Sequence, residues 1–355
     1  MWEAYPSDYR AAEVSRVVSA VRTGDSVAII GLSGAGKSNL MGFMAHRVDA
    51  QPVSFVLVDC NKLRETSTDG LFRLVSAELG IRAIADGTTC YENVDNAIRA
   101  RFIGAPGTTL CLLFDRFDAA AAGGADLFSN LRALRDTHKY KLTYVFATRH
   151  ALPATNELAE LLHANTIWIG PLVSADARWT IQQYARRKGL VWSSDVEEQL
   201  MQVSHAYPSL LRGACEARAA GVANLEDSET ISLRVSEFWA DAPTNAELVN
   251  SGLHDAHILI KRAPPGFARD FAINTDALTG KEMGLLKYLQ SHPHNICAKD
   301  DIIRSVWTED QAFVIGVRDE SLAQLIRRLR EKIEPDSSKP RHIVTVPGRG
   351  YKYVP

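Results

Sequence analysis

The sequence has few cysteines and no long apolar run, and each absence excludes a class of protein. Its five cysteines are scattered among 355 residues and none forms the C-x-x-C pair of a zinc site. This usage predicts a reduced, cytoplasmic compartment and no disulfide framework. No apolar stretch reaches the length of a membrane-spanning helix, and residues 1–6, with an acid and a proline, do not resemble a signal peptide. We therefore expect a cytoplasmic protein with no membrane partner.

Net charge is also nearly absent, but its distribution is uneven. The chain has 40 lysines and arginines against 42 aspartates and glutamates. Residues 256–355 hold 16 basic against 12 acidic side chains, and residues 1–255 hold 24 against 30. A basic C-terminal part is a weak indication of nucleic acid at that end. The length is too great for one ordinary core, so we expect two or three domains.

The clearest motif is the stretch 31–38, GLSGAGKS, which fits G-x-x-x-x-G-K-[ST] at every position. An apolar run at 26–30 precedes it, and 39–47 can continue as a helix. Glycines allow several N–H groups to point at one anion, and a helix N-terminus adds positive charge. A chance glycine-rich turn is the alternative. The residues expected to bind ATP in this loop are Gly31, Ser33, Gly34, Ala35, Gly36, Lys37, Ser38 and Asn39.

Strands alternate with helices over residues 1–171, which predicts an α/β domain: a parallel sheet with helices on both faces. The expected strands are 26–30, 53–59, 109–115 and 141–148, and the expected helices are 8–22, 69–80, 91–103 and 125–137. Such sheets bind ligands at the carboxyl ends of their strands. Asp59, Asp115 and Arg149 fall at such ends, together with the loop 31–38.

Four residues are expected to act on the phosphates and the metal. Lys37 should reach the β- and γ-phosphates, and Asp115 should hold Mg²⁺ together with the Ser38 hydroxyl. Arg149 could contact the γ-phosphate as a bidentate donor. The alternatives are an ordinary aspartate at the end of a buried strand and a solvent-facing arginine.

The residue after Asp115 predicts slow hydrolysis. Most hydrolysing P-loop enzymes carry an acid there, which orients the attacking water, but this chain has Arg116. A cation cannot accept the proton of that water. We therefore predict tight ATP binding with slow turnover.

Residues 172–241 show only helical patterns, at 175–188, 194–205, 208–220 and 227–239. We expect a helical lid over the nucleotide, in which Pro208 and Arg212 face the adenine and the phosphates. A proline at 208 is almost equally typical of an ordinary helix start. The polar stretch 242–255, broken by proline and glycine, predicts a linker.

Residues 8–222 resemble the STAND and origin-recognition branches of the AAA+ superfamily. The matching segments are 9–13, 31–38, 112–115, 147–149 and 205–208. The resemblance implies that ATP switches the protein between a closed monomer and a homo-oligomer, and it places Arg10 at the nucleotide. Departures are Arg116 and the pair His205-Ala206, where the family usually has glycines. Arg132 and Arg135 are candidates for a trans-acting arginine finger.

Residues 256–355 predict a small α+β domain. Strands are expected at 256–261 and 267–273, helices at 281–291, 298–307 and 320–333, and a hairpin at 342–354. The last helix is amphipathic, with Leu322 and Leu329 on its apolar face. On its polar face, Gln324 can pair with adenine and Arg328 with guanine, each through two hydrogen bonds.

This block resembles the winged-helix DNA-binding domain of OmpR/PhoB-type response regulators, through segments 278–282, 305–307, 325–330 and 348–351. The resemblance implies that the third helix enters the major groove of double-stranded DNA and that the hairpin wing touches the minor groove. The expected DNA contacts are Ser321, Gln324, Arg327, Arg328, Arg330, Arg349 and Lys352. Departures are Glu320, where the family commonly has arginine, and Pro347, which replaces a wing arginine. The loop 308–319 carries three apolar residues that suggest a protein partner.

The sequence thus predicts a P-loop domain (1–171), a lid (172–241), a linker (242–255) and a C-terminal winged helix-turn-helix domain (256–355). The predicted function is a transcription regulator whose ATP state controls oligomerisation and DNA occupancy. The alternative is a DNA-targeted ATPase that recruits or remodels a partner in phage defence or a mobile element. A replication initiator is a third possibility.

Overall fold

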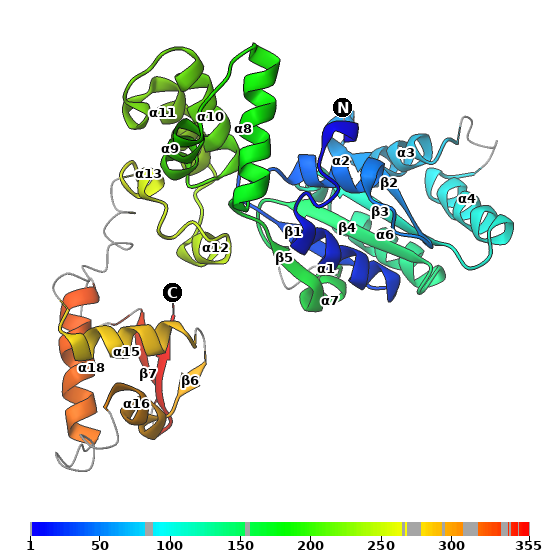
Figure 1. Cartoon of the computed structure of the whole chain (residues 1–355). Coiled ribbons are helices and arrows are strands. Elements are labelled where there is room, and N and C mark those ends of the chain that lie inside the picture. Colours follow the sequence, from blue (N-terminus) through cyan, green and yellow to red (C-terminus); the bar gives the residue numbers. More distant parts are fainter. Residues whose placement is uncertain are drawn as a thin grey trace. The chain divides into compact units, whose positions relative to one another are not determined.

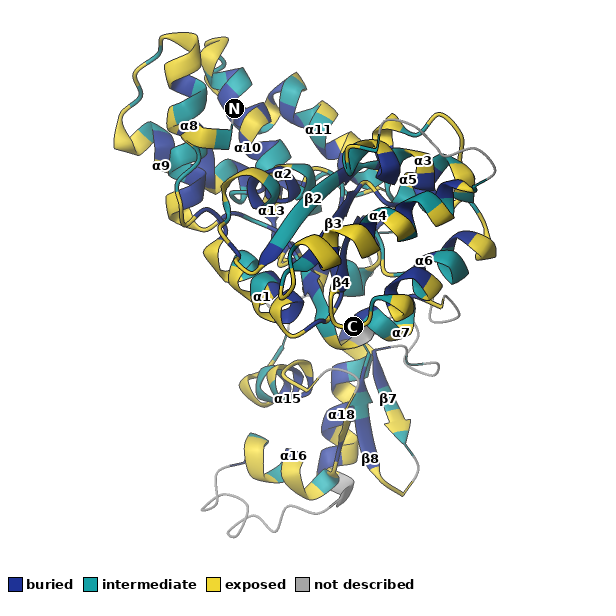
Figure 2. Cartoon of the chain, turned by 90° about the vertical axis from the view of Figure 1, so that its right-hand side faces the viewer, coloured by how far each residue is buried: buried dark blue, intermediate teal, exposed yellow. Residues whose placement is uncertain are grey.

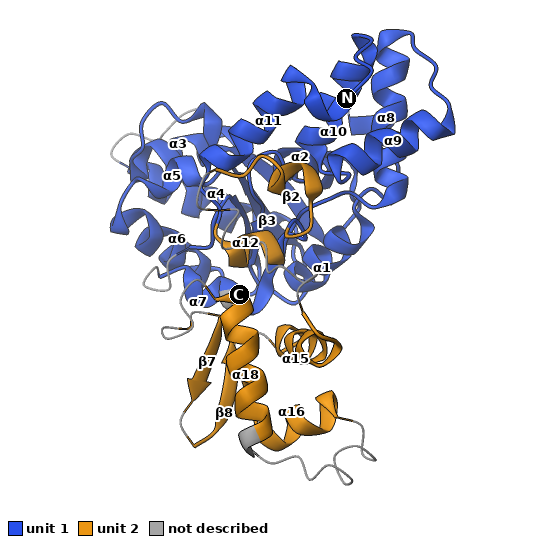
Figure 3. Cartoon of the chain, turned by 90° about the vertical axis from the view of Figure 1, so that its left-hand side faces the viewer, with its two compact units in different colours: residues 1–243, 250–253 blue, residues 244–249, 254–355 orange. Residues whose placement is uncertain are grey.

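The chain folds into two compact units. One comprises residues 1–243 and 250–253, and the other residues 244–249 and 254–355 (Figure 3). The computed structural model describes residues 2–81, 88–152, 157–264, 267, 278–292, 295–307, 319–334, 340, 342–346 and 348–354. Within these ranges no helix has the length and apolarity needed to cross a bilayer.

A five-stranded parallel sheet forms the centre of the first unit, in the order β2-β3-β4-β1-β5 (Figure 1). The strands are β1 (Val27–Ile30), β2 (Val53–Asp59), β3 (Thr109–Asp115), β4 (Leu142–Thr148) and β5 (Thr166–Trp168). Asp59 lies opposite Asp115, and Ile30 lies opposite both Thr148 and Trp168. This register brings the carboxyl ends of the strands to one edge, which is where such sheets bind ligands.

Helices cover both faces of this sheet. The helices of the α/β region are α1 (Ala11–Arg22), α2 (Lys37–Arg47), α3 (Thr68–Glu78), α4 (Cys90–Gly104), α5 (Asp118–Ala121), α6 (Ala125–Thr137) and α7 (Ala159–Leu162). Short 3-10 turns are η1 (Trp2–Ala4), η2 (Cys60–Lys62) and η3 (His163–Asn165). Helices α1 and α2 pack on one face of the sheet, and α3, α4 and α6 pack on the other. Successive residues of each strand therefore face different helices.

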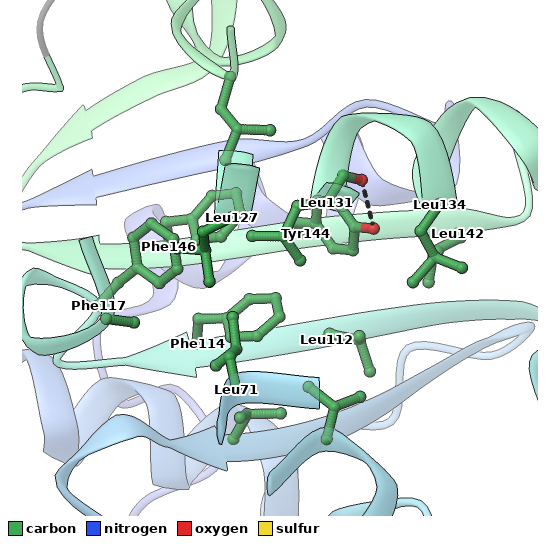
Figure 4. Close-up of a cluster of buried hydrophobic side chains, with 14 of the residues drawn as sticks. Leu71, Leu112, Phe114, Phe117, Leu127, Leu131, Leu134, Leu142, Tyr144 and Phe146 are labelled. Carbon is green, nitrogen blue, oxygen red and sulfur yellow. Dashed lines mark hydrogen bonds between the residues drawn. The ribbon is translucent and has the colours of Figure 1, made fainter. Parts of the chain in front are cut away.

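The core between the sheet and helices α3, α4 and α6 is rich in aromatic side chains. Alternate residues of β4, among them Tyr144 and Phe146, point into it beside Phe114 and Phe117 (Figure 4). The Phe114 and Phe146 rings stack with centroids 5.1 Å apart. Strands β3 and β4 are apolar along nearly their whole length because both of their faces are buried, whereas exposed residues line the outer sides of the helices (Figure 2).

Four further helices and one turn follow β5 in the first unit. They are α8 (Ser174–Lys188), α9 (Ser194–Ser204), α10 (Pro208–Ala219), η4 (Leu225–Asp227) and α11 (Glu229–Ala240). Helix α10 packs against α8, α9 and α11, which makes it the central helix of this group. The all-helical prediction for this region is confirmed, with helix bounds that differ by one or two residues.

The second unit contains a three-stranded antiparallel sheet in the order β6-β8-β7. Its elements are α12 (Asn245–Asn250), α13 (His257–Ile260), α15 (Gly280–Gln290), β6 (Ile296–Cys297), α16 (Lys299–Val306), α18 (Asp319–Ile333), β7 (Ile343–Val346) and β8 (Gly350–Tyr353). Helices α15, α16 and α18 share one apolar core with β8, to which Leu286, Leu322 and Tyr351 contribute. Buried Glu282 of α15 pairs with Lys332 of α18 at 2.7 Å, which joins the first and third helices.

Some predicted elements differ from the structure. The strand expected at 256–261 is wrong, because residues 257–260 form α13. An apolar run of this length fits a buried helical turn as well as a strand. The strand expected at 267–273 and most of loop 308–319 lie outside the described residues, and the stretch 242–255 contains α12. Strands β5 and β6 were not anticipated, since three and two residues are too few for a periodic pattern.

Tyr144 provides a test of this core. Its hydroxyl donates a hydrogen bond to the Leu131 carbonyl at 2.9 Å, deep in the cluster (Figure 4). Replacing it with phenylalanine removes one buried hydrogen bond, and we expect a loss of about 1 kcal/mol in the free energy of unfolding. Urea denaturation followed by circular dichroism measures this. Tyr140→Phe is the control because its ring is 65% exposed. Equal stability of the two variants would contradict this assignment.

Candidate nucleotide site and DNA-recognition face

The loop between β1 and α2 has the backbone conformation of an anion-binding loop. Gly34 and Gly36 have φ angles of 83° and 87°, in the left-handed region. A side chain at Gly34 would be strained, and its β-carbon would also lie 2.1 Å from the Ser209 hydroxyl. Helix α2 begins at Lys37, directly after the loop. The helix N-terminus therefore adjoins the loop at the place where an anion would bind. Two of the loop N–H groups already donate within the chain, that of Ala35 to the Leu32 carbonyl and that of Ser33 to Asp241, both at 3.1 Å.

Lys37 folds back on its own loop. Its amine donates hydrogen bonds to the carbonyls of Gly31 and Leu32. Burial lowers the pKa of Lys37 to about 8, although the charges of Asp118, Asp115 and Asp241 oppose the shift. The amine is thus a buried cation that water solvates poorly, and a phosphate would stabilise its charged form.

Asp115 and Ser38 lie side by side at the carboxyl end of β3. Asp115 is 5% exposed and hydrogen-bonds to the Ser38 hydroxyl, and burial raises its pKa. One hydroxyl beside one carboxylate fits Mg²⁺, which takes few protein ligands and completes its shell with phosphate and water. Among the described residues there is no cluster of three or more His, Cys, Asp or Glu side chains that could hold a metal without a nucleotide.

Arg116 approaches the same hydroxyl. Its backbone N–H donates to Asp115 Oδ1 at 3.0 Å, and its Nε lies 3.5 Å from Ser38 Oγ. Its φ of 53° is unusual for a residue with a side chain. The cation therefore lies beside the expected metal ligand, where a hydrolytic enzyme would have an acid.

Arg149 lies at the end of β4 between two carboxylates. Its backbone N–H donates to both Asp118 oxygens at 3.1 Å, and its guanidinium pairs with Asp241 at 2.9 Å. The other Asp241 oxygen accepts from the Ser33 N–H at 3.1 Å. Arg149 is thus linked to the P-loop through the carboxylate of Asp241, which follows α11. The place of Arg149 at the carboxyl end of β4 is the one expected from the sequence.

Helix α10 contacts the P-loop with its first residues. The Tyr207 hydroxyl donates to the carbonyls of Leu32 and Ser33 at 3.1 and 2.8 Å, and the Ser209 N–H donates to the Gly34 carbonyl at 3.1 Å. Tyr207 is fully buried. These bonds hold the start of the third lid helix directly on the loop.

A pocket of about 700 Å³ opens between these elements. It is lined by Ser33, Gly34, Ala35, Gly36, Lys37, Ser38, Asn39, Asn61, Arg116, Asp118, Ala119, Arg149, Pro208, Ser209, Arg212 and Arg234. Most of the predicted nucleotide residues are therefore together. Arg212 is on the pocket wall but pairs with Glu216 at 2.9 Å, and Asp115 is buried behind Ser38 and Arg116.

His205 and Ala206, which precede α10, have φ angles of 52° and 51°. This is the conformation that glycine adopts without strain. Pro208, which follows these two residues, lines the pocket.

Arg10 is placed behind the loop. It is 2% exposed, and its guanidinium donates to the carbonyls of Ala35 and Gly170, both at 2.9 Å, and to Glu13. Its backbone N–H donates to Asp176 of α8. The Arg10 side chain thus bonds to the backbone of the loop, and in this structure Arg10 positions the loop.

Neither arginine-finger candidate is freely exposed. Arg135 is buried, donates to the Gly24 carbonyl and pairs with Asp136. Arg132 pairs with Asp136 and Glu160. Both side chains serve contacts within their own unit.

The polar face of α18 is the candidate DNA-recognition surface. Ser321, Gln324, Arg327 and Arg328 are all exposed, opposite the buried face that carries Leu322. Arg327 pairs with Glu331 one turn later at 2.9 Å, and the Arg327 side chain is 81% exposed. The structure therefore places the two candidate base-reading residues and one phosphate-binding arginine on one free face.

Arg330 is placed differently from this group. Its guanidinium donates to the Ile343 carbonyl through two nitrogens and to the Thr345 hydroxyl at 2.8 Å, and it lies over the Tyr351 ring. Burial lowers the pKa of Arg330. It joins α18 to the hairpin, whereas Arg349 is exposed at the hairpin turn and Lys352 is half-buried on β8.

Two family models match the chain in separate places. Residues 21–155 match an AAA domain, and residues 275–353 match the C-terminal domain of transcriptional regulatory proteins. The chain therefore joins a P-loop NTPase domain of the AAA type to a winged-helix domain of the OmpR/PhoB type, which confirms the predicted fold class.

Curated relatives match part of the chain. The transcriptional regulatory protein YvrH of Bacillus subtilis is 38% identical over 119 residues, which is 34% of this chain and 40% of that protein. The uncharacterised transcriptional regulatory protein YcbL of the same organism is 44% identical over 78 residues, 21% of this chain and 31% of that protein. The chain thus spans well under half the length of these relatives. Among solved structures, Cdc6p from Pyrobaculum aerophilum has a TM-score of 0.43 and 14% identity, covering 96% of this chain and 88% of that one.

The pKa of Lys37 predicts a pH dependence of nucleotide binding. The free amine loses its proton above about pH 8. A polyanion favours the protonated form, so binding above pH 8 requires proton uptake, and affinity should fall by up to about tenfold per pH unit. Titration with a fluorescent ATP analogue at pH 7.5, 8.5 and 9.5 measures this.

Lys37→Met is the control for that titration. It should bind more weakly at pH 7.5 and should show no comparable slope, because the titrating amine is gone. Equal affinity of the wild type at all three pH values would contradict the assignment, provided circular dichroism shows the chain folded throughout.

Proposed function

Because the chain carries an AAA domain and the C-terminal domain of transcriptional regulatory proteins, we propose that it is an ATP-binding transcription regulator whose nucleotide state controls oligomerisation and DNA occupancy. One observation carries this proposal. The P-loop, the ends of β3 and β4, and the start of α10 line the same pocket. A ligand there would contact the sheet and the lid at once, and would therefore alter how the two are held.

The residues of the pocket fit a nucleoside triphosphate with Mg²⁺. The loop N–H groups from Gly34 to Asn39 and the Lys37 amine would hold the phosphates, with Arg149 beside the terminal one. Ser38 and Asp115 would hold the metal. When bound, the nucleotide supplies a polyanion that the lid and the sheet can both contact, and its metal offsets part of that charge.

We propose that hydrolysis is slow. The residue after Asp115 is a cation at the Ser38 hydroxyl, and Asp118, the next acid, accepts hydrogen bonds from the Arg149 N–H. Neither group is placed as a free general base. Slow turnover would let the ATP-bound form persist long enough to act as a state of the regulator.

The partner proposed for the winged-helix domain is double-stranded DNA. Gln324 and Arg328 would read base edges, and Ser321, Arg327, Arg349 and Lys352 would contact the backbone or the minor groove. A protein partner at loop 308–319 remains a proposal from the sequence. The relatives named above are regulatory proteins, which favours transcription over the alternative of a DNA-targeted remodelling ATPase.

Light scattering on the full-length chain tests the nucleotide switch. We expect a larger mass with ATP than with ADP or no nucleotide, since only the triphosphate contacts Arg149 as well as the P-loop. Lys37→Ala should keep the smaller mass in all three conditions, and Lys188→Ala, an exposed lysine at the end of α8, should behave as wild type. Identical masses for wild type in every condition would overturn the switch.

Selection from random duplexes, followed by binding titrations, tests the recognition face. Arg328→Ala should lose about 1–3 kcal/mol of preference for the selected sequence over unrelated DNA. Arg327→Ala should weaken binding to all sequences alike and make it less dependent on salt. Lys287→Ala, on the exposed side of α15, is the control for removal of a basic residue. If Arg328→Ala and Lys287→Ala have the same effect, α18 does not read the bases.

A further inference from the structure

Asp241 is an acidic residue that lies in the site although no sequence motif marks it. It follows α11 directly, and its carboxylate is only 9% exposed. One oxygen accepts a hydrogen bond from the Ser33 N–H at 3.1 Å, and the other pairs with the Arg149 guanidinium at 2.9 Å. A single carboxylate thus joins the P-loop, the end of β4 and the end of the lid.

The two groups that Asp241 binds are groups that would otherwise face a phosphate. The Ser33 N–H belongs to the loop that turns its donors toward an anion, and Arg149 is the cation proposed for the terminal phosphate. Asp241 is also close enough to Lys37 for its charge to favour the protonated amine. The Asp241 carboxylate accepts a hydrogen bond from a backbone N–H, pairs with a guanidinium and lies near an ammonium group. A phosphate in the same place would be stabilised by the same three groups.

We propose that Asp241 is an internal competitor for the terminal phosphate of a nucleoside triphosphate, and that it sets the selectivity of the pocket between triphosphate and diphosphate. This rests on the proposed nucleotide binding. A carboxylate and a terminal phosphate cannot share Ser33 N–H and Arg149 without strong repulsion between like charges. A diphosphate needs neither group and leaves Asp241 in place.

The same competition reaches the chain that leads to the second unit. Asp241 is two residues from Pro243, at which the first unit's main segment ends. Ala242, between them, has a φ of 46°, a conformation that costs a residue with a side chain free energy. The contacts of Asp241 hold this segment in that path. When Asp241 leaves Ser33 and Arg149, the end of α11 loses its two polar bonds to the P-loop and to β4, while its helical bonds, such as that from the Ala242 N–H to the Trp239 carbonyl at 3.0 Å, stay in place.

A purely structural role for Asp241 predicts something different. A carboxylate that only tied the lid to the P-loop would, when neutralised, loosen the pocket for every nucleotide. Affinities for triphosphate and diphosphate would then fall together. The competitor model requires the two affinities to separate, with the triphosphate binding more tightly.

The test compares Asp241→Asn with Glu229→Gln in the full-length chain. Each substitution removes one negative charge and keeps the side chain nearly the same shape. Asp241 follows the last residue of α11, whereas Glu229 is the first residue of that helix and is exposed. The probes are fluorescent derivatives of ADP and of a non-hydrolysable ATP analogue, titrated with Mg²⁺ present. We expect Asp241→Asn to tighten triphosphate binding by about tenfold or more and to change diphosphate binding by less than about threefold, because only the first loses a like-charge neighbour. Glu229→Gln should change neither.

A second measurement follows the chain itself. Hydrogen exchange of the amides at the end of α11 should increase when the wild type binds the ATP analogue, and should not increase with ADP. In Asp241→Asn that segment should exchange faster before any nucleotide is added.

Each outcome decides between the models. Equal changes in both affinities, or no difference from Glu229→Gln, would overturn the inference while the proposed nucleotide binding stands. Triphosphate binding that is tighter in Asp241→Asn than in the wild type, with diphosphate binding nearly equal in the two proteins, would support it. If neither protein binds either nucleotide, the proposed function fails and this inference fails with it.

Discussion

The structure depends on how the carbonyl groups of the P-loop are bonded. Five successive carbonyls of the loop each accept a hydrogen bond from a donor within the first unit. The donors are Lys37 for Gly31, Tyr207 for Leu32 and Ser33, Ser209 for Gly34, and Arg10 for Ala35. A peptide unit whose carbonyl is held on one side presents its N–H on the other. The backbone path of the loop is therefore set before any anion arrives, and the changes that binding requires are confined to the side chains of Lys37 and Asp241.

Apart from Lys37, those donors come from distant parts of the chain, so the loop connects several parts of the first unit. Arg10 also bonds the end of β5 and, through its backbone, α8, while Tyr207 and Ser209 belong to the start of α10. The loop is thus tied to the segment before the sheet, to the sheet and to the lid. A change in any one of them changes the anion site, and binding at the site acts on all of them. This reciprocity is the physical basis of the proposed switch.

Much of the fold could be predicted because its signals are local. Strands β2 and β3 could be placed residue for residue, since each is a mostly apolar run that ends in aspartate. The P-loop follows from motif spacing, and the amphipathic pattern of α18 follows from helical periodicity. The role of Asp241 could not be found in this way, because its partner Ser33 is 208 residues away and an acid at the end of a helix has no distinctive pattern. The bonds of Arg330 could not be predicted for a related reason: its position on α18 suits a DNA contact, but the hairpin to which it also donates comes later in the chain.

The bonds of Arg330 have a consequence for how a duplex can be read. They fasten α18 to β7 at two points, the Ile343 carbonyl and the Thr345 hydroxyl, beside the Tyr351 ring of β8. In the proposed DNA complex, α18 would enter one groove and the hairpin the neighbouring groove. Because Arg330 bonds the two elements together, the distance between them would be set by the protein, and the helical repeat and groove width of the DNA would have to match it. Sequences that never touch the protein can then influence affinity through the spacing between the grooves.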